Sequence, residues 1–287
     1  MNKIEVIQTI GNPHSGSTLF SIILGSVHGF FNAGELKNIT RDTLPVELCS
    51  CGNTVENCNF WQEVFTKWEI ERVSSFKEYK YLYLKYERVS GIIKILWNLI
   101  FPTETFNLYI KDTEKLYRII YKLSGNSVIV DSSKMPQRTL ILSRFAKVKI
   151  VHLCRDFKGV LNSSKKQSSK DLNKGLEKTK QVNSSLRTLT MWVSLNLVCE
   201  ILTSFQDSYK IKFKDFVSDF TYFSKVDARA TGIKQFSIFS TEHMVAGNRL
   251  RLNKNIEVKN TPSCYERLSK TNLLFASIID KVFFFWS

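Results

Sequence analysis

The chain contains little proline and little glycine. Among its 287 residues there are 5 prolines and 12 glycines, and no stretch rich in these residues or in serine divides the sequence into two parts. No internal repeat is visible either. Because 43% of the residues are hydrophobic, a chain of this length can bury a large core, which excludes a disordered protein. We therefore expect a single domain over residues 1–287.

Long apolar runs are lacking as well. The strongest one, GIIKILWNLIF at residues 91–101, contains Lys94 and is too short to cross a bilayer. The N-terminal residues lead into a strand-like sequence and show neither the apolar segment nor the cleavage site of a signal peptide. The 6 cysteines do not make a disulfide scaffold in so long a chain. We expect a cytoplasmic protein, and nothing in the sequence supports membrane association.

Acidic residues are scarce relative to basic ones. The chain has 26 Asp and Glu against 41 Lys and Arg, a formal net charge of +15. The resulting positive surface potential favours anionic ligands, nucleic acid or acidic membranes. A basic nucleic-acid-binding protein is one alternative, but the sequence shows no recognisable binding module, and its aromatic residues lie mostly in apolar runs typical of a core. We expect no nucleic-acid partner.

Short apolar runs of β character alternate with helical patterns. This alternation predicts an α/β fold with a central parallel sheet. The expected strands are at residues 4–10, 127–130, 148–153 and 209–213, and the expected helices at 17–28, 75–86, 113–123, 138–145 and 185–205.

The sequence GNPHSGST at residues 11–18 follows a predicted strand and precedes a predicted helix. A phosphate-binding loop has this context, because the first N–H groups of a helix have no partner within the helix. Ser17, however, occupies the place of the P-loop lysine, and His14 is the side chain of the loop with the most similar reach. The sequence thus predicts an anion site, or alternatively a simple Ser/Thr cap on a core helix. A kinase or other P-loop nucleotide-binding protein is the nearest alternative enzyme, and Ser17 counts against it.

A second stretch, VHLCRDFKGVLNSS at residues 151–164, places Arg155 at the end of an apolar strand and Ser163 eight residues later. The carboxyl ends of parallel strands are where α/β folds bind ligands, and the forked donors of arginine suit a phosphate. Arg155 and Asp156 taken alone could instead form a structural ion pair. Together with the first loop, the stretch predicts a second phosphate pocket.

These two stretches resemble the 5′-phosphosulfate loop and the 3′-phosphate motif of bacterial-type sulfotransferases that use 3′-phosphoadenosine-5′-phosphosulfate (PAPS). Three further stretches resemble the same family in the same order: CSCGNTVENCNFWQEV at 49–64, VIVDSSKMPQRTLIL at 128–142 and HMVAGNRLRL at 243–252. The resemblance implies an α/β fold in three αβα layers like that of P-loop NTPases, with helices on both faces of the central parallel sheet. It also implies transfer of a sulfuryl group from PAPS to a hydroxyl or amine by in-line displacement. The acceptor would be a small molecule, a glycan or a lipid. A phosphosulfate donor would also explain the absence of the P-loop lysine.

The resemblance implies two groups of donor-binding residues. The 5′-phosphosulfate would be held by Pro13, His14, Ser15, Gly16, Ser17 and Thr18, and the 3′ end by Arg155, Ser163 and a segment with Asn248, Arg249 and Arg251. Many members of the family carry Lys or Arg at the position of His14. Histidine can stabilise the transferring group as a cation below its pKa or as a neutral N–H donor above it.

Three residues are the catalytic candidates: Glu35, His14 and Lys134. Glu35 is the expected base, in preference to His28, which is expected at the C-terminus of a helix. A carboxylate works best as a base when burial raises its pKa. Lys134 is expected as a cation near the leaving oxygen, although an ordinary exposed lysine is an equal alternative.

Cys49, Cys51 and Cys58 have the spacing C-x-C-x6-C. Structural zinc usually takes four protein ligands, and no fourth ligand is near in the sequence. The pattern therefore favours a redox-sensitive pair or a small structural loop, and we expect no metal.

Two further segments carry predictions about access to the site. A lysine-rich stretch at about 163–185 is a candidate gate over the donor, or alternatively a solvated linker. Residues 53–126 are expected to form a helical insertion on the acceptor side, with nothing in them that specifies the acceptor.

Overall fold

The computed structural model describes residues 3–167, 169–171, 182–231, 233, 237–239, 243–257 and 265–287. Its centre is a five-stranded parallel sheet in the order β2-β3-β1-β4-β5. These strands are β1 (Ile4–Gly11), β2 (Phe30–Gly34), β3 (Val128–Lys134), β4 (Ala146–Cys154) and β5 (Ser208–Lys212). A short antiparallel pair, β6 (Ser237–Phe239) and β7 (Asn255–Glu257), lies apart from this sheet. The predicted α/β fold with a central parallel sheet is confirmed.

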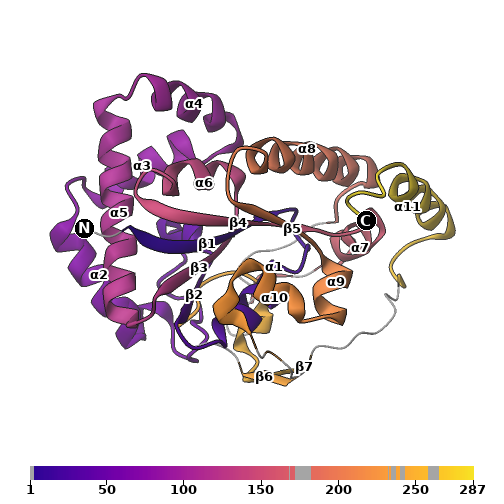
Figure 1. The fold of residues 1–287 in the computed structure, drawn as a ribbon, viewed down its shortest axis with the longest axis horizontal. Coiled ribbons are helices and arrows are strands. Elements are labelled where there is room, and N and C mark those ends of the chain that lie inside the picture. Colours follow the sequence, from indigo (N-terminus) through magenta and orange to yellow (C-terminus); the bar gives the residue numbers. More distant parts are fainter. Residues whose placement is uncertain are drawn as a thin grey trace.

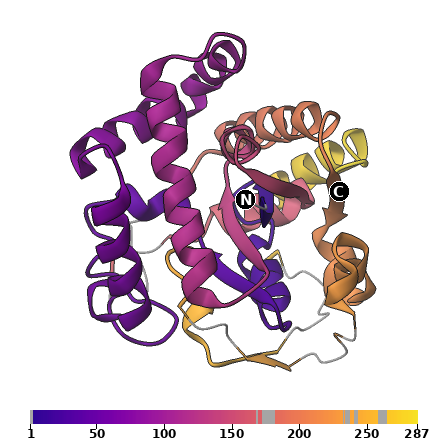
Figure 2. The ribbon, with the colours of Figure 1, turned by 60° about the vertical axis from the view of Figure 1, so that its left-hand side comes forward.

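Helices cover both faces of the sheet, so the fold has the expected three αβα layers (Figure 1). The helices are α1 (Ser17–Gly25), α2 (Asn59–Glu71), α3 (Phe76–Tyr86), α4 (Ile92–Ile100), α5 (Glu104–Ser124), α6 (Pro136–Leu142), α7 (Phe157–Ser164), α8 (Ser185–Thr203), α9 (Phe213–Ser218), α10 (Thr221–Val226) and α11 (Lys270–Val282). In Figure 2 the helices of the predicted insertion, α2 to α5, gather at one side of the molecule. Within the described part of the chain, no helix is long and apolar enough to cross a membrane.

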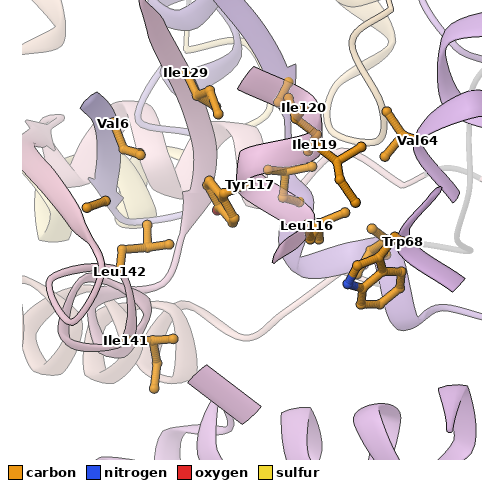
Figure 3. Packing of buried hydrophobic residues seen from close by; sticks show 14 of the residues in the cluster. Val6, Val64, Trp68, Leu116, Tyr117, Ile119, Ile120, Ile129, Ile141 and Leu142 are labelled. Carbon is orange, nitrogen blue, oxygen red and sulfur yellow. The ribbon is translucent and has the colours of Figure 1, made fainter. Parts of the chain in front are cut away.

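The central strands are apolar on both faces, and consecutive residues pack into different cores. Val6 belongs to a cluster with α2, α3, α5 and α6, whereas Ile7 belongs to one with α1, α9 and α10. This alternation follows from the two-residue period of a strand. In Figure 3, side chains of α5 lie between those of the sheet and those of α2; they include Leu116, Tyr117 and Ile120, with Val6 and Ile129 on one side and Val64 and Trp68 on the other.

The edge strand β2 and the full length of α5 were not predicted. The sequence of β2, FFNAG, is short and ends in residues that are common in loops, so its pattern does not distinguish a strand. Helix α5 begins at Glu104 rather than at residue 113, because Thr103 caps it by accepting a hydrogen bond from the backbone N–H of Phe106 (3.3 Å).

Candidate functional site

The carboxyl ends of four neighbouring strands bring the candidate residues to one edge of the sheet. Glu35 follows β2, Lys134 ends β3, the 11–18 loop follows β1, and Arg155 follows β4. The register places Lys134 opposite Ile10 and Leu153 opposite Gly11. Segments far apart in the sequence thus meet where parallel α/β sheets bind their ligands.

The loop at 11–18 has a backbone that only a glycine-rich sequence adopts easily. Gly11 and Gly16 have φ values of 135° and 90°, and His14 has a φ of 72°. A Cβ on Gly16 would lie 2.4 Å from a ring carbon of Phe213, so the close approach of this ring also requires glycine. Asn12 anchors the loop to helix α8, because its Nδ2 donates a hydrogen bond to the carbonyl of Trp192 (3.2 Å).

Two serine hydroxyls at 11–18 are buried, and their environment indicates a binding site for an anion. The Oγ atoms of Ser15 and Ser17 have no hydrogen-bond partner among the described residues, and the two residues are at most 2% exposed. Buried polar groups are normally hydrogen-bonded, so an unpartnered pair at the start of a helix fits a bound anion. The alternative of a Ser/Thr cap is wrong, because the N-cap of α1 is Gly16 and it makes no side-chain cap bond. Thr18 is buried in the first turn of α1, Pro13 is exposed and His14 is half-buried.

Arg155 lies against the loop rather than out in solvent. Its Nη1 donates to the carbonyl of His14 (2.8 Å), and its guanidinium lies over the ring of Phe213 at 4.5 Å. Its Nε is buried and has no hydrogen-bond partner among the residues that the structure describes. Burial lowers the pKa of Arg155, and the nearby Asp156 opposes this shift. Asp156 itself caps α7 by accepting from Gly159 N (2.8 Å), so it has a structural task of its own.

The remaining residues predicted to bind the 3′ end of the donor differ in how far they are buried. Ser163 is half-buried in α7, and Asn248 and Arg249 are exposed at the start of the 3-10 helix Arg249–Leu252. Arg251 is fully buried, with Nη1 donating to Gly247 O and Nη2 to Leu48 O, both at 3.0 Å. Arg251 therefore holds two backbone segments together, which does not fit the predicted contact with a donor phosphate.

Glu35 and Lys134 form an ion pair, so Lys134 is not an ordinary exposed lysine. Lys37 approaches the other carboxylate oxygen at 3.5 Å, and Asn38 Nδ2 donates to it at 3.1 Å. Burial raises the pKa of Glu35, but the positive charges of Lys134 and Lys37 outweigh it and bring the pKa down to about 2. Glu35 is therefore a carboxylate at neutral pH and lacks the raised pKa that favours a catalytic base.

The predicted competitor of Glu35 lies elsewhere. Helix α1 ends at Gly25, so His28 is in an exposed turn beyond the helix rather than at its C-terminus. The expected interaction of His28 with the helix dipole is therefore wrong.

A buried charge network holds the end of β3, and it was not predicted from the sequence. Arg138 donates from Nε to Asp131 (2.9 Å) and from Nη1 to both oxygens of Glu87 (2.7 and 2.8 Å), and all three side chains are at most 1% exposed. Tyr117 also donates to Asp131. Asp131 in turn accepts from Ser133 N (2.9 Å), next to Lys134. The network thus links the strand that carries Lys134 to α5 and α6.

One cavity adjoins the 11–18 loop, and another lies beside the segment that follows Glu35. A small one of about 60 Å³ is bounded by Pro13, His14, Val160 and Ser164, between the 11–18 loop and α7. A larger, mainly apolar one of about 350 Å³ is lined by Ile39, Leu44, Phe65, Trp68 and Phe76 among others, partly from the predicted insertion. None of the candidate catalytic residues lines the second cavity, and its link to them is Ile39, on the 3-10 helix that follows Glu35. The candidate gate at 163–185 lies in part outside the described residues, because 168 and 172–181 are not among them.

The three cysteines have a neighbour that the sequence did not reveal. His243 comes from the far end of the chain, and its Nδ1 lies 3.2 Å from Cys58 Sγ. One ligand atom from each of Cys49, Cys51, Cys58 and His243 lies within 4.8 Å of the others. The fourth potential metal ligand that the spacing lacked is therefore present in space.

Comparisons with known proteins give similarity of structure only. No family model matches the chain, and no curated protein matches it in sequence. Among solved structures, the sulfotransferase domain from the curacin biosynthetic pathway aligns over 98% of this chain and 99% of its own, with a TM-score of 0.47 and 13% identity. The sulfotransferase domain from the Synechococcus PCC 7002 olefin synthase aligns over 97% and 96%, with a TM-score of 0.44 and 15% identity. Similarities this weak do not establish what the chain binds.

Proposed function

We propose that the protein is a PAPS-dependent sulfotransferase. The observation that carries the proposal is the pair of buried, unpartnered hydroxyls of Ser15 and Ser17 in a P-loop-like turn that lacks the P-loop lysine. Such a cradle supplies hydroxyl and backbone donors but less positive charge than a triphosphate requires. Arg155, on the next strand, supplies a cation with a free Nε for a second phosphate.

The residues present fit the donor's two anionic ends. Ser15, Gly16, Ser17 and the first turn of α1 would hold the 5′ end, and Arg155, with Ser163 near it in sequence, the 3′ end. When bound, PAPS supplies an activated sulfuryl group. The N-terminus of α1 and His14 would supply donors to the negative charge that develops during transfer, and preorganised donors stabilise such charge without reorganisation.

Glu35 and Lys134 have separate tasks in this account. Glu35 is held as a carboxylate by Lys134 and Lys37, so it accepts a hydrogen bond from the acceptor's hydroxyl or amine and orients it for in-line attack. With a pKa of about 2 it is a weak base, so it would take the acceptor's proton late, as the new bond to sulfur forms and the bond from sulfur to the bisphosphate oxygen breaks. Lys134, whose side chain is 17% exposed, supplies positive charge at the end of β3 next to the loop.

The experiment is turnover of PAPS in the presence of a panel of hydroxyl and amine acceptors, with formation of adenosine 3′,5′-bisphosphate as the readout. The wild-type protein should release the bisphosphate with at least one acceptor and give a sulfated product by mass spectrometry. Glu35→Gln should lose roughly 100-fold or more of this activity while still binding the bisphosphate. Near-normal turnover by Glu35→Gln would remove Glu35 from the mechanism.

A further inference from the structure

The loop that carries the three cysteines is folded tightly on itself. Gly52 has a φ of 96°, its N–H donates to Cys49 O (3.0 Å), and the N–H of Cys49 donates to Asn53 O (2.9 Å). This turn directs Cys49 and Cys51 toward the same point, and Cys58 reaches it from the N-cap of α2. Five free cysteines are described; these three gather around one point with His243, whereas Cys154 lies with His152 and Glu200 in a separate group.

We propose that Cys49, Cys51, Cys58 and His243 bind a structural zinc ion. Three thiolates and one imidazole are a common donor set for structural zinc, which is four-coordinate and tetrahedral. Bonds of about 2.3 Å to sulfur and about 2.0 Å to nitrogen place neighbouring ligand atoms roughly 3.5 to 3.8 Å apart. The four atoms here lie within 4.8 Å of one another, so only small side-chain movements separate the observed arrangement from a metal site.

The surroundings hold the imidazole in place. The ring of Phe60 stacks on that of His243, with centroids 5.1 Å apart and planes at 14°. Trp61 Nε1 donates to the carbonyl of His243 (2.6 Å), which helps to fix a residue with a φ of 63°. Outer contacts of this kind orient metal-bound histidines and sharpen affinity.

Charge and backbone pairing support the same centre. Three thiolates and one Zn²⁺ carry a net charge of −1. The buried guanidinium of Arg251 donates to the carbonyl of Leu48, the residue before Cys49, and so places a positive charge close to it. Ser50 and Met244, each next to a proposed ligand, bond to each other twice, through Ser50 N to Met244 O (3.0 Å) and Met244 N to Ser50 Oγ (2.7 Å).

The zinc would fasten the segment after His243 against the candidate site. Val245 O accepts from the N–H of Glu35 (3.0 Å), and a Cβ on Gly247 would lie 3.3 Å from Glu35 Oε1. The metal would therefore lie next to the backbone segment 243–247, which contacts Glu35, and would not touch the reacting atoms. This inference does not depend on the proposed sulfotransferase activity.

The test is the zinc content of the full-length protein purified under reducing conditions, measured by elemental mass spectrometry. Wild type should carry one zinc per chain. Cys51→Ser, at an exposed position where the substitution leaves no core cavity, should lose it, and so should His243→Asn. The control Cys199→Ser removes a buried cysteine outside the cluster and should keep full occupancy.

Two further readouts keep the test decisive if a variant folds poorly. A strong chelator should lower the melting temperature of wild type by at least about 5 °C, and added zinc should restore it. Co²⁺ in place of zinc should show thiolate-to-metal charge-transfer absorption that Cys51→Ser lacks. The proposal is overturned if reduced wild type neither contains nor takes up zinc, if Cys199→Ser loses as much metal as Cys51→Ser, or if thiol blocking and mass measurement show two of the three cysteines joined in a disulfide.

Discussion

Glu35 and Lys134 are 99 positions apart in the sequence and form an ion pair at the carboxyl edge of the sheet. Each follows or ends a strand, β2 and β3, and these strands are neighbours. The pair lies beside the loop with the two unpartnered serines, because β1 is the next strand along. The fold itself thus brings a carboxylate and a cation together next to this loop, and under the proposed function they would serve the acceptor and the leaving oxygen.

The ion pair makes a prediction about stability in acid. The pKa of Glu35 is about 2 in the folded protein, against an ordinary value near 4.5, so its stabilising charge is fully present above about pH 4.5 and is lost as the pH falls toward 2. Glu35→Gln should therefore be less stable than wild type at pH 7, by up to about 3 kcal/mol. The difference should shrink steadily below pH 4.5. Urea unfolding at a series of pH values measures it.

Glu63→Gln is the control for this series. Glu63 pairs with Lys67 on the surface and is 53% exposed, so its removal should change stability by less than about 0.5 kcal/mol. A Glu35→Gln difference that is as large at pH 2.5 as at pH 7 would contradict the assigned charge state.

The buried network around Arg138 should be costly to break. Arg138→Met leaves the carboxylates of Glu87 and Asp131 buried without their cation, which should destabilise the protein by about 3 to 5 kcal/mol. Arg118→Ala removes a surface partner of Glu114 and should cost less than about 0.5 kcal/mol. Both are measured by chemical denaturation, and similar values for the two variants would show that the network contributes little.

Gly16→Ala tests whether the loop must have its observed shape. The added Cβ would lie 2.4 Å from the ring of Phe213 at a φ of 90°, so we expect a loss of about 2 to 3 kcal/mol and weaker anion binding. Gly125→Ala is the matched control, because Gly125 also has a positive φ of 64° but has open space around its Cβ position. It should cost about 1 kcal/mol from backbone strain alone. If Gly16→Ala and Gly125→Ala lose equal amounts of thermal stability and of anion affinity, the close contact with Phe213 is disproved.

His14 allows a test of the charge that sulfuryl transfer needs. The bond from Arg155 goes to the backbone carbonyl of His14, so a change of side chain leaves this anchor in place. His14→Lys should raise turnover of PAPS at pH 8 by about tenfold and make it less dependent on pH, because lysine stays charged there. His14→Ala should lose turnover while keeping bisphosphate binding. If His14→Lys is slower than wild type at every pH, the cation at this position is not what the reaction needs.

The strands that end at the 11–18 loop and at Arg155 could be predicted from the sequence. Features that depend on contacts between distant residues could not. The strands before the 11–18 loop and before Arg155 were found because central parallel strands are almost wholly apolar. The strand β2 was missed because its five residues carry no distinctive pattern. The lowered pKa of Glu35 could not be predicted, because two lysines, one of them 99 positions away, outweigh the effect of its burial.

Local sequence also could not reveal partners brought in by the fold. His243 lies 185 positions after Cys58, so the spacing of the cysteines alone predicted no metal. Arg251 was expected to contact the 3′ end of the donor, but the structure buries it against the carbonyls of Leu48 and Gly247. Ser15 and Ser17, by contrast, lie just before and at the start of helix α1, as the local sequence predicted, and their contact with an anion stays a prediction.

Calorimetric titration with adenosine 3′,5′-bisphosphate, adenosine 5′-phosphate and ATP with Mg²⁺ tests the central claim most directly. The account predicts that only the bisphosphate binds tightly, and that Arg155→Ala weakens it by roughly 10- to 100-fold, as expected for the loss of a charge-assisted phosphate contact. Arg229→Ala, which removes the same charge near the opposite edge of the sheet beside Glu5, should bind as wild type does. Tighter binding of ATP, or equal binding of all three ligands, would contradict a sulfotransferase donor site.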